Sequence, residues 1–402
     1  MAIVRMIDIC EKIGSGATPR GGKEAYCKEG ISLVRSQNVL DFVFSQDGLA
    51  FINDEQAKKL NNVEVQASDV LLNITGDSVA RACIMDTSYL PARVNQHVAI
   101  IRGKTDRVLN NYILYFLQWK KENLLQLASA GATRNALTKG MIEQLELDLP
   151  TLTEQKKIVA VLDSLQDKIR INQKINDNLY DLLQAVYQLQ FGVTSGNAAE
   201  GTLSDICRYT KDRIAVSELS LGNYYSTENI LPGKAGFTEA TSLPTTSQTT
   251  RCNAGDVLVS NIRPYFKKIV LCHSEGGCST DVLCFVPKAP AYSSYLFCTL
   301  YADRFFDFMV AGSKGTKMPR GDKQQIMTYP VYIPTESELT AFADFATPIL
   351  SQIHGNNEEN ARLEHLRDTL LPKLMSGEIA VSDIDISAAK LSFSKERGVF
   401  YA

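Results

Sequence analysis

The sequence predicts an α+β protein made of two related globular domains, each followed by one long helix. Three observations indicate this fold: a long internal repeat, short strand and turn patterns within each copy, and two stretches with apolar residues at 3–4 spacing. We expect the two helices to form an antiparallel coiled coil, so that the chain has a pseudo-two-fold internal repeat. At 402 residues the chain is also longer than a usual single domain.

The internal repeat is clearest in two apolar segments that share an acidic residue. Residues 65–72 (VQASDVLL) resemble residues 252–259 (CNAGDVLV), so that Asp69 aligns with Asp256, 187 positions later. Within each copy, β-branched runs alternate with Gly, Asn and Pro, which is typical of strands and turns. Because this period is far too long for a solenoid, we interpret the chain as a duplicated unit of domain plus helix.

The boundaries of the parts follow from composition and periodicity. We expect a first globular domain at 1–150, a first long helix at 151–191, a second globular domain at 192–334, a second long helix at 335–379 and a C-terminal tail at 380–402. Each globular domain should contain one helical stretch, at 111–130 and at 293–310. The first copy starts without the lead-in that Ser204 and Asp205 provide in the second, and residues 382–384 repeat it. We therefore expect the tail to complete the first domain, with a frayed tail as the alternative.

The two long helices share a seam whose residues follow in steps of four and three. Such steps average about 3.5 residues, which is the period of a coiled coil. Thr151 and Glu154 form a capping box directly before the first series. Pro348 interrupts the second series, where it predicts a kink or a late start of the helix. The residues that we expect to pair the helices are Leu162, Leu165, Ile169, Asn172, Asn176 and Leu179 in the first helix and Ile349, Ile353, Asn356, Asn360 and Leu363 in the second.

The asparagines of the seam recur 184 positions later, Asn172 as Asn356 and Asn176 as Asn360. Antiparallel pairing should place Asn172 opposite Asn360 and Asn176 opposite Asn356, because buried amides fix the register of a coiled coil. The alternative is a polar middle segment that both copies inherited. A paired seam of this length would be a stiff spacer of roughly 50 Å. Such a spacer suits a protein that contacts two separated sites.

Composition limits the class of protein. With a net charge of −3, any binding to nucleic acid must depend on local basic patches or on a partner. The sequence shows neither an apolar run that could span a bilayer nor a secretory signal, so we expect a cytoplasmic protein. The nine cysteines never form a Cys-x-x-Cys pair. We expect buried thiols rather than a metal site, also around Cys272, His273, Cys278 and Cys284.

Motifs for catalysis are missing from the sequence. The string from Asn261 to Phe266 (NIRPYF) lacks the adjacent proline pair of an adenine methyltransferase loop, and no Gly-rich cofactor turn precedes it. Residues 312–317 (GSKGTK) lack the spacing of a P-loop. The four histidines share no motif. We therefore expect a non-catalytic protein with no metal and no cofactor of its own.

Two segments resemble a known family. Residues 149–169 (LPTLTEQKKIVAVLDSLQDKI) resemble the beginning of a helix in the specificity (S) subunit of Type I restriction–modification systems, and residues 366–379 (LRDTLLPKLMSGEI) resemble its closing segment. The resemblance implies two target recognition domains, at 1–150 and 192–334, joined by the two helices. It implies nothing about the DNA sequence that is read, because its motifs cover only the helices and their approaches.

The same resemblance implies a function for the chain. It would be the sequence-specific subunit that binds double-stranded DNA at a bipartite target and directs two methyltransferase (modification) subunits and the restriction subunits of a Type I complex. S-adenosylmethionine, ATP and Mg2+ would then be bound by these partner subunits, and no membrane would be involved. Two alternatives stay open: an orphan or anti-restriction specificity protein, and a purely structural coiled-coil scaffold.

A basic, glycine-containing loop precedes each long helix and suits contacts with DNA. Residues 129–140 (SAGATRNALTKG) align with residues 311–323 (AGSKGTKMPRGDK). Glycine lets the backbone approach phosphates, and Arg and Lys can bind phosphates or guanine edges, while Asn can read adenine. The alternative is that these are ordinary solvated turns. The candidate DNA-binding residues are Arg35, Asn38, Arg81, Arg134 and Lys139 in the first domain and Arg263, Lys267, Lys268, Lys314, Lys317, Arg320 and Lys323 in the second.

Overall fold

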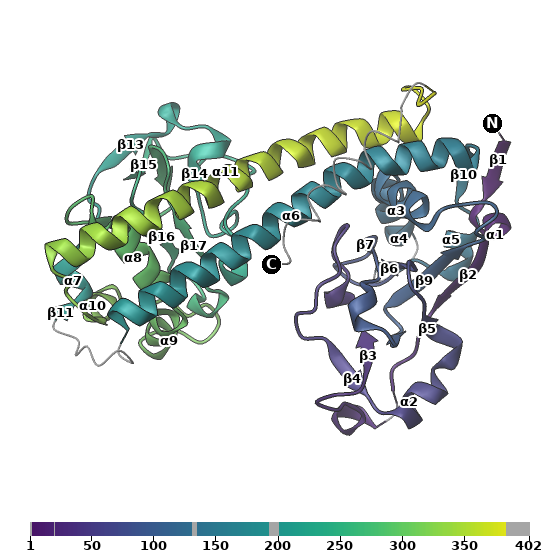
Figure 1. Ribbon diagram of the computed structural model, residues 1–402, viewed down its shortest axis with the longest axis horizontal. Helices are drawn as coiled ribbons and strands as arrows, with labels where there is room; N and C mark the ends of the chain where they lie inside the picture. Colours follow the sequence, from purple (N-terminus) through teal and green to yellow (C-terminus); the bar gives the residue numbers. More distant parts are fainter. Residues whose placement is uncertain (1, 20, 131–134, 193–200, 383–402) are drawn as a thin grey trace, which may run out of the picture. The chain divides into compact units, whose positions relative to one another are not determined.

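The computed structural model describes residues 2–19, 21–130, 135–192 and 201–382. It divides into two compact units: unit 1 comprises residues 1–170 and 360–402, and unit 2 comprises residues 171–359. Each unit contains an α+β domain and a segment of each of two long helices, α6 (Leu152–Phe191) and α11 (Glu336–Met375) (Figure 1). The predicted α+β class is thus confirmed.

Unit 1 contains two four-stranded sheets and one two-stranded sheet. The first sheet has the order β2-β9-β6-β7 and is antiparallel throughout. The second has the order β4-β3-β8-β5, in which β3 and β8 are parallel. The strands are β1 (Ala2–Arg5), β2 (Cys10–Ser15), β3 (Ile31–Val34), β4 (Ala50–Ile52), β5 (Glu64–Val65), β6 (Val70–Asn73), β7 (Ala82–Ile84), β8 (Ala92–Val94), β9 (Val98–Gly103) and β10 (Glu146–Leu149). The helices are α1 (Met6–Ile9), α2 (Asp54–Lys59), α3 (Asn110–Trp119), α4 (Lys121–Ser129) and α5 (Lys139–Glu143).

Unit 2 repeats this plan with one difference in its second sheet. The sheet β12-β19-β16-β17 corresponds to β2-β9-β6-β7, and the parallel pair β14-β18 corresponds to β3-β8. The fourth strand differs, because β13 joins the edge next to β15, whereas β4 joins the edge next to β3. The strands are β11 (Gly201–Thr202), β12 (Cys207–Tyr209), β13 (Arg213–Ala215), β14 (Tyr224–Tyr225), β15 (Gln248–Cys252), β16 (Val257–Ser260), β17 (Ile269–Leu271), β18 (Gly276–Cys278), β19 (Val282–Pro287) and β20 (Pro330–Val331). The helices are α7 (Leu203–Ile206), α8 (Tyr292–Tyr301), α9 (Asp303–Ala311) and α10 (Lys323–Met327).

Strand β6 lies between two cores, which explains its uninterrupted apolar sequence. Val70 and Leu72 lie in one core with helix α3, whereas Leu71 lies in the other core with the second sheet. Successive side chains of a strand point to opposite faces, so a strand that is covered on both faces carries no polar alternation. Strand β16 divides its side chains between two cores of unit 2 in the same way.

The helical stretch predicted within each domain is broken into two helices. In unit 1 the break lies at Lys120, between α3 and α4, where the backbone leaves the helical region (φ −87°, ψ 12°). In unit 2 it lies at Ala302, between α8 and α9, which is extended (ψ 139°). The two turns let each pair of helices bend around the core that holds Phe116 in unit 1 and Phe305 in unit 2. The prediction of one continuous helix is therefore wrong in both copies.

The beginning of the first domain also differs from the prediction. Strand β1 pairs antiparallel with β10, with Ala2 opposite Leu149 and Arg5 opposite Glu146. The equivalent pair in unit 2 is β11 with β20. The first domain therefore has its own lead-in strand. The tail prediction falls largely on residues outside the described ranges; of the described part, Val381 is buried in the core of unit 1.

The long helices run antiparallel, as predicted. In unit 1, Arg367 of α11 donates a 2.8 Å hydrogen bond to Gln166 of α6. In unit 2, the rings of Tyr187 and Phe342 lie 6.2 Å apart, and Asn356 donates a 2.7 Å hydrogen bond to Asn176. Within each helix the partners therefore follow in opposite order along the chain.

The eleven residues that were predicted to pair the helices are all at least half-buried. Leu162, Ile169, Asn172, Asn176, Ile353, Asn356 and Asn360 are buried, and Leu165, Leu179, Ile349 and Leu363 are half-buried. The predicted Asn176–Asn356 pair is confirmed by a hydrogen bond. Asn172 donates a 2.7 Å hydrogen bond to Glu359, and its pairing with Asn360 stays a prediction.

Both long helices begin at a capping box. The Thr151 hydroxyl accepts the Glu154 backbone N–H, and the Glu154 carboxylate accepts the Thr151 N–H at 2.9 Å. Thr335 and Glu338 repeat this arrangement at the beginning of α11. The late start predicted at Pro348 is therefore wrong, since the helix begins twelve residues earlier and continues through that residue. The buried Phe342, Ala346 and Leu350 around Pro348 stabilise the helix there.

Candidate nucleic-acid interface

In unit 1 the loop after β6 is joined by backbone hydrogen bonds to the loop before α5. Thr75 and Ala136 form an isolated antiparallel bridge. Gly76 donates to the Asn135 carbonyl at 3.1 Å, and Leu137 donates to the Ile74 carbonyl at 2.8 Å. The two loops, which are about sixty residues apart in the chain, therefore form one surface.

In unit 2 the same contacts recur at the offsets of the sequence repeat. Ile262 and Arg320 form the bridge, and Arg263 donates to the Pro319 carbonyl at 2.8 Å. Gly321 donates to the Asn261 carbonyl at 3.3 Å. The structure thus brings together two groups of candidate residues that the sequence analysis treated as separate: the cluster at 263–268 and the loop 311–323.

The candidate basic residues of unit 2 lie on this joined surface, and three of them form ion pairs with carboxylates. Lys314 lies 2.6 Å from Asp322, which raises the pKa of the lysine and lowers that of the carboxyl through their hydrogen bond. Arg320 lies 3.0 Å from Asp281. Exposed pairs of this kind contribute little to stability, so their cations can exchange partners readily. Lys267 is paired with Asp303 at 2.9 Å, and Lys317 and Lys323 are exposed.

The backbone around Arg263 is strained. Arg263 (φ 50°) and Lys267 (φ 51°) both adopt the left-handed region, on either side of the short helix η9 (Pro264–Phe266). Each such non-glycine residue costs about 1–3 kcal/mol and persists only where its surroundings hold it. The hydrogen bond from Arg263 to Pro319 and one from Lys234 to the Lys267 carbonyl, at 2.9 Å, fix the loop at both ends.

Arg81 and Lys268 occupy equivalent places in the two units, but their side chains differ in how readily they can reach a ligand. Asn73 donates to the Arg81 carbonyl at 2.8 Å, and Ser260 donates to the Lys268 carbonyl at 3.1 Å, so the predicted match of these positions is confirmed. The Lys268 ammonium turns inward to the Thr227 carbonyl at 2.5 Å, and burial lowers its pKa. The Lys268 side chain is half-buried, and its contact with DNA stays a prediction. The Arg81 side chain is half-buried.

Of the other candidate DNA-binding residues of unit 1, two are less exposed to solvent than expected. Asn38 is fully buried: its amide donates to the Ser45 and Asp47 carbonyls and accepts the Arg35 N–H at 3.0 Å. The Asn38 amide is turned away from solvent, and its contact with a base stays a prediction. Arg35 donates to the Gly48 carbonyl at 2.5 Å and is half-buried. Lys139 is exposed and lies 3.4 Å from Glu143, whereas Arg134 lies outside the described residues.

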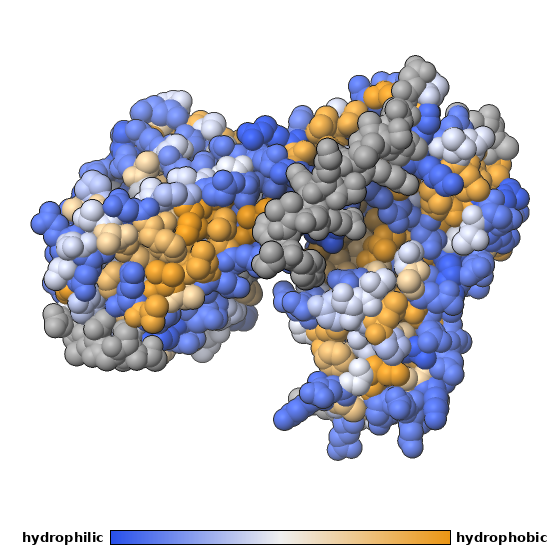
Figure 2. Space-filling view, viewed as in Figure 1, coloured by the Kyte–Doolittle hydropathy of each residue, from blue (hydrophilic) through white to orange (hydrophobic). Residues whose placement is uncertain are grey.

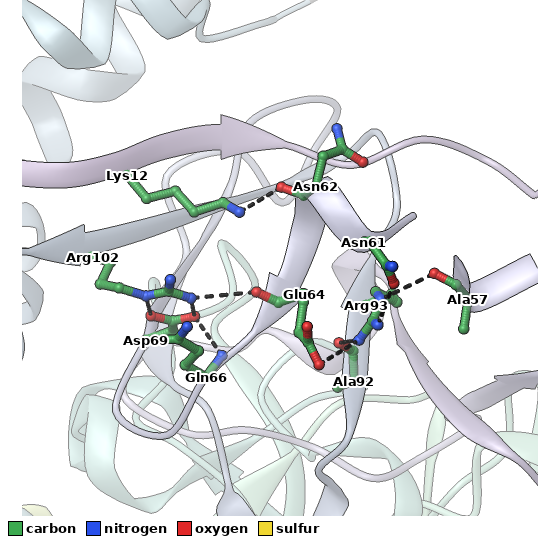
Figure 3. A network of polar contacts seen from close by, with 10 residues as sticks. All are labelled: Lys12, Ala57, Asn61, Asn62, Glu64, Gln66, Asp69, Ala92, Arg93 and Arg102. Atoms are coloured by element: carbon green, nitrogen blue, oxygen red, sulfur yellow. Dashed lines mark hydrogen bonds and ion pairs between the residues drawn. The ribbon is translucent and has the colours of Figure 1, made fainter. Parts of the chain in front are cut away.

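A buried aspartate precedes the strand before each loop, at Asp69 before β6 and at Asp256 before β16. In unit 1, Arg102 donates two hydrogen bonds of 2.6 Å to the Asp69 carboxylate, which also accepts the Gln66 N–H at 2.7 Å (Figure 3). In unit 2, the aligned Asp256 accepts the Asn253 N–H at 2.8 Å and a weak bond from the Cys284 thiol. Burial raises the pKa of Asp256. The aspartate therefore forms the same turn in both copies, but it is bound to an arginine in unit 1 and to a thiol in unit 2.

Cysteines and histidines do not form a metal centre in the described part of the chain. Cys252, Cys272, Cys278 and Cys284 are free and buried in one core of unit 2. The hydrogen bond with Cys252 and burial raise the pKa of the Cys272 thiol, and burial raises the pKa values of the Cys278 and Cys284 thiols. His273 stacks on His354 with ring centroids 3.8 Å apart. Within the described ranges, no three His, Cys, Asp or Glu side chains come together as a possible metal site.

A second surface, which the sequence analysis missed, lies on the outer side of α6 in unit 2. Ile171, Ile175, Leu182 and Leu189 are exposed, although all are large and apolar. They follow in steps of four and seven, so they lie on one face of the helix, and Figure 2 shows an apolar band over this part of α6. The sequence does indicate this face, because these apolar residues form a second series of helical spacing next to the series of the seam. Such a face is typical of a site that another helix covers.

These features define a class of protein: a duplicated protein in which each α+β domain has one joined loop surface and the two long helices run antiparallel. Neither long helix, nor any shorter one in the described ranges, carries the continuous apolar stretch of a membrane-spanning segment.

Comparison with known proteins shows what the chain resembles. Residues 1–180 match the model of the Type I restriction modification DNA specificity domain. Over 117 residues the chain is 28% identical to a Methanocaldococcus jannaschii protein named for the specificity subunit of the type I restriction enzyme MjaX, a match that spans 29% of this chain and 26% of that protein. The crystal structure of a Type I restriction–modification S subunit from M. genitalium has a TM-score of 0.54 to this fold, at 15% identity over 93% of this chain and 96% of that chain. The predicted resemblance to the Type I DNA specificity domain is thus confirmed for residues 1–180.

Proposed function

We propose that this chain is the sequence-specific DNA-binding subunit of a Type I restriction–modification complex, and that it reads a bipartite target with one domain per half-site. The observation that carries the proposal is the joined loop surface, which is built by the same backbone contacts in both units. In unit 2 it presents several basic side chains on glycine-containing loops. Such side chains suit phosphates and guanine edges.

The duplication supports a target with two parts. Each unit has its own cores and its own loop surface, so each can bind DNA separately. The loops differ in sequence between the units, so the two half-sites should differ too. The net charge of −3 is compatible with this function because the loop surface of unit 2 is locally basic, with seven basic residues and one acidic residue in 261–268 and 311–323.

The apolar face of α6 supports docking of a modification subunit. A partner helix with its own apolar stripe would cover Ile171, Ile175, Leu182 and Leu189, as in helix-in-groove recognition. In such a complex the partner subunits supply S-adenosylmethionine, ATP and Mg2+ and perform methylation and cleavage. This chain supplies target choice and has no catalytic role.

The test is to co-express the chain with the modification subunit of its own locus and to map methylated adenines in the host DNA. We expect one methylated motif with two specified parts and an unspecified gap. Co-expression of the modification subunit alone is the control and should give no such motif.

The alternative functions give different results. An anti-restriction or orphan protein would bind DNA but would not support methylation by this partner. A purely structural scaffold would support methylation without a shared motif. A single uninterrupted motif would contradict the assignment of one half-site to each domain.

A further inference from the structure

The loop between β16 and β17 in unit 2 carries two solvent-exposed aromatic side chains. Tyr265 is 50% exposed and Phe266 is 39% exposed, and their ring centroids lie 4.8 Å apart. Both belong to η9, the short turn between the two strained residues described above. The equivalent loop of unit 1, residues 74–81 (ITGDSVAR), contains no aromatic residue. The pair is therefore a special feature of unit 2 rather than of the shared fold.

The backbone conformation of this loop is fixed, so the two rings are held in position before any ligand binds. The strained conformation at Arg263 and Lys267 turns the chain sharply on both sides of the rings. Hydrogen bonds to the Pro319 carbonyl and from the Lys234 N–H hold both turns. Strained, over-determined loops of this kind cluster at binding sites, where the strain keeps the contacting groups in place.

The charge around the rings identifies the chemistry of the ligand. Residues 261–268 and 311–323 together carry seven basic residues and one acidic residue. The Arg263 guanidinium makes no hydrogen bond or ion pair with any described residue, and its Nε is buried without a partner. An apolar protein surface would leave the Arg263 guanidinium unpaired, whereas a polyanion with flat apolar faces provides a partner for both this cation and the rings.

We propose that Tyr265 and Phe266 form a wedge that enters a groove of the DNA bound by unit 2 and stacks on bases that it separates, while Arg263 contacts the flanking phosphate. The inference rests on the proposed function of the chain in DNA recognition. Apolar side chains that enter between base steps unstack them and kink the duplex. The cost of this deformation depends on the step, so the wedge selects flexible steps without a hydrogen bond to a base. Unit 2 thus deforms its half-site, and unit 1 has no equivalent device in this loop.

The test uses the full chain in complex with its modification subunit and duplexes that contain the mapped motif. In each duplex one position of the motif carries 2-aminopurine, whose fluorescence rises when it is unstacked. We expect a rise on binding at one or two adjacent positions in only one half of the motif. The double variant Tyr265→Ala/Phe266→Ala should abolish the rise and weaken binding about 5- to 100-fold. Leu221→Ala, which truncates another exposed apolar side chain of unit 2, should change neither.

A second measurement is independent of the double variant. The chain contains a single tryptophan, Trp119, so Tyr265→Trp in a Trp119→Phe background carries one fluorophore in the loop. Its emission should be quenched by the specific duplex and not by an unrelated duplex at the same salt concentration. Sequence-specific binding without a 2-aminopurine signal in the wild-type complex, or without quenching in the Tyr265→Trp variant, would overturn the wedge and leave DNA recognition intact. A wild-type complex that shows no sequence preference would instead overturn the proposed function, and the wedge with it.

Discussion

Loop 74–81 of unit 1 and loop 261–268 of unit 2 occupy equivalent places between two antiparallel strands, yet they expose different chemistry. The first is small, with one acidic and one basic residue, whereas the second is basic and carries two exposed aromatic rings. The backbone contacts that join each loop to its neighbour are the same in both units. The duplication has therefore kept the scaffold of the surface and changed the groups that it presents.

The long helices differ between the copies in the same way. Leu182 of α6 and the aligned Leu366 of α11 are almost equally exposed, at 46% and 45%. Leu182 lies on a face with Ile175 and Leu189, whereas the residues aligned with these on α11 are Glu359 and Lys373. The seam is alike in both helices and the outer faces are not. We infer that the two copies share a fold but divide their contacts with DNA and with partners unequally.

The largest expected effect concerns the buried aspartates. Asp69→Asn removes one partner of a buried ion pair with Arg102 and should lower the free energy of unfolding of unit 1 by about 3–5 kcal/mol. The only tryptophan, Trp119, lies in unit 1, so denaturant unfolding followed by its fluorescence reports on this unit. Asp256→Asn is the matched control and should leave this transition unchanged. An unchanged midpoint for Asp69→Asn would contradict the structural role of the pair.

The next effect concerns partner binding. Leu182→Asp places a charge in the middle of the apolar face of α6 and should weaken binding of the modification subunit by about 1–3 kcal/mol. Leu366→Asp is the control, since it introduces the same charge at the aligned and equally exposed position. Calorimetric titration of the modification subunit into each variant measures the difference. Equal losses in the two variants would show that the apolar face of α6 has no special role.

A smaller effect is expected for the salt dependence of DNA binding. Lys317 and Arg320 have no basic counterpart in unit 1, where Thr133 and Ala136 align with them. The double variant Lys317→Ala/Arg320→Ala should therefore reduce the slope of log affinity against log salt by about 2, and Lys139→Ala by about 1 at most. Fluorescence anisotropy at several salt concentrations provides the slopes. A larger change for Lys139→Ala would reverse the assignment of the stronger basic surface to unit 2.

The smallest effect is expected at Asp256 itself. Burial raises its folded-state pKa above the unfolded value, so the folded state binds the proton more tightly. Unit 2 should therefore lose stability as the pH rises from the unfolded pKa through the folded one, and the loss persists at neutral pH. Asp256→Asn should remove this dependence and raise stability at neutral pH by less than about 1 kcal/mol. Hydrogen exchange in β16 measured at two pH values tests the sign, and a gain of stability on raising the pH would contradict it.

Local patterns explain why much of the fold could be predicted. The duplicated segments around Asp69 and Asp256 form equivalent turns, and the 3–4 spacing identified the seam with the Asn176–Asn356 pair. Each of these features is encoded within a few helical turns or one strand. Strand β1 could not be predicted in the same way, because its four residues pair with β10, which lies far along the chain.

The direction of individual polar side chains was the least predictable part of the site. Asn38 and Lys268 are residue types that often contact DNA. Here their side chains donate hydrogen bonds to the backbone carbonyls of Ser45 and Thr227 instead. Whether a side chain meets water or a carbonyl depends on a distant loop, which sequence spacing does not contain. The joining of loop 262–268 to loop 311–323 is a long-range contact of the same kind. The apolar face of α6, in contrast, could have been predicted from the helical spacing of its residues, although it was missed.

The central claim is that each unit reads its own half of the target, and it is tested most directly by mapping methylation with a variant of one unit. In Arg263→Ala/Arg320→Ala only the loop surface of unit 2 is changed. Adenine methylation mapped in cells that contain this variant and the modification subunit should retain one half of the wild-type motif and show relaxed sequence preference in the other half. Relaxation of both halves together, or a motif identical to that of the wild type, would contradict the account.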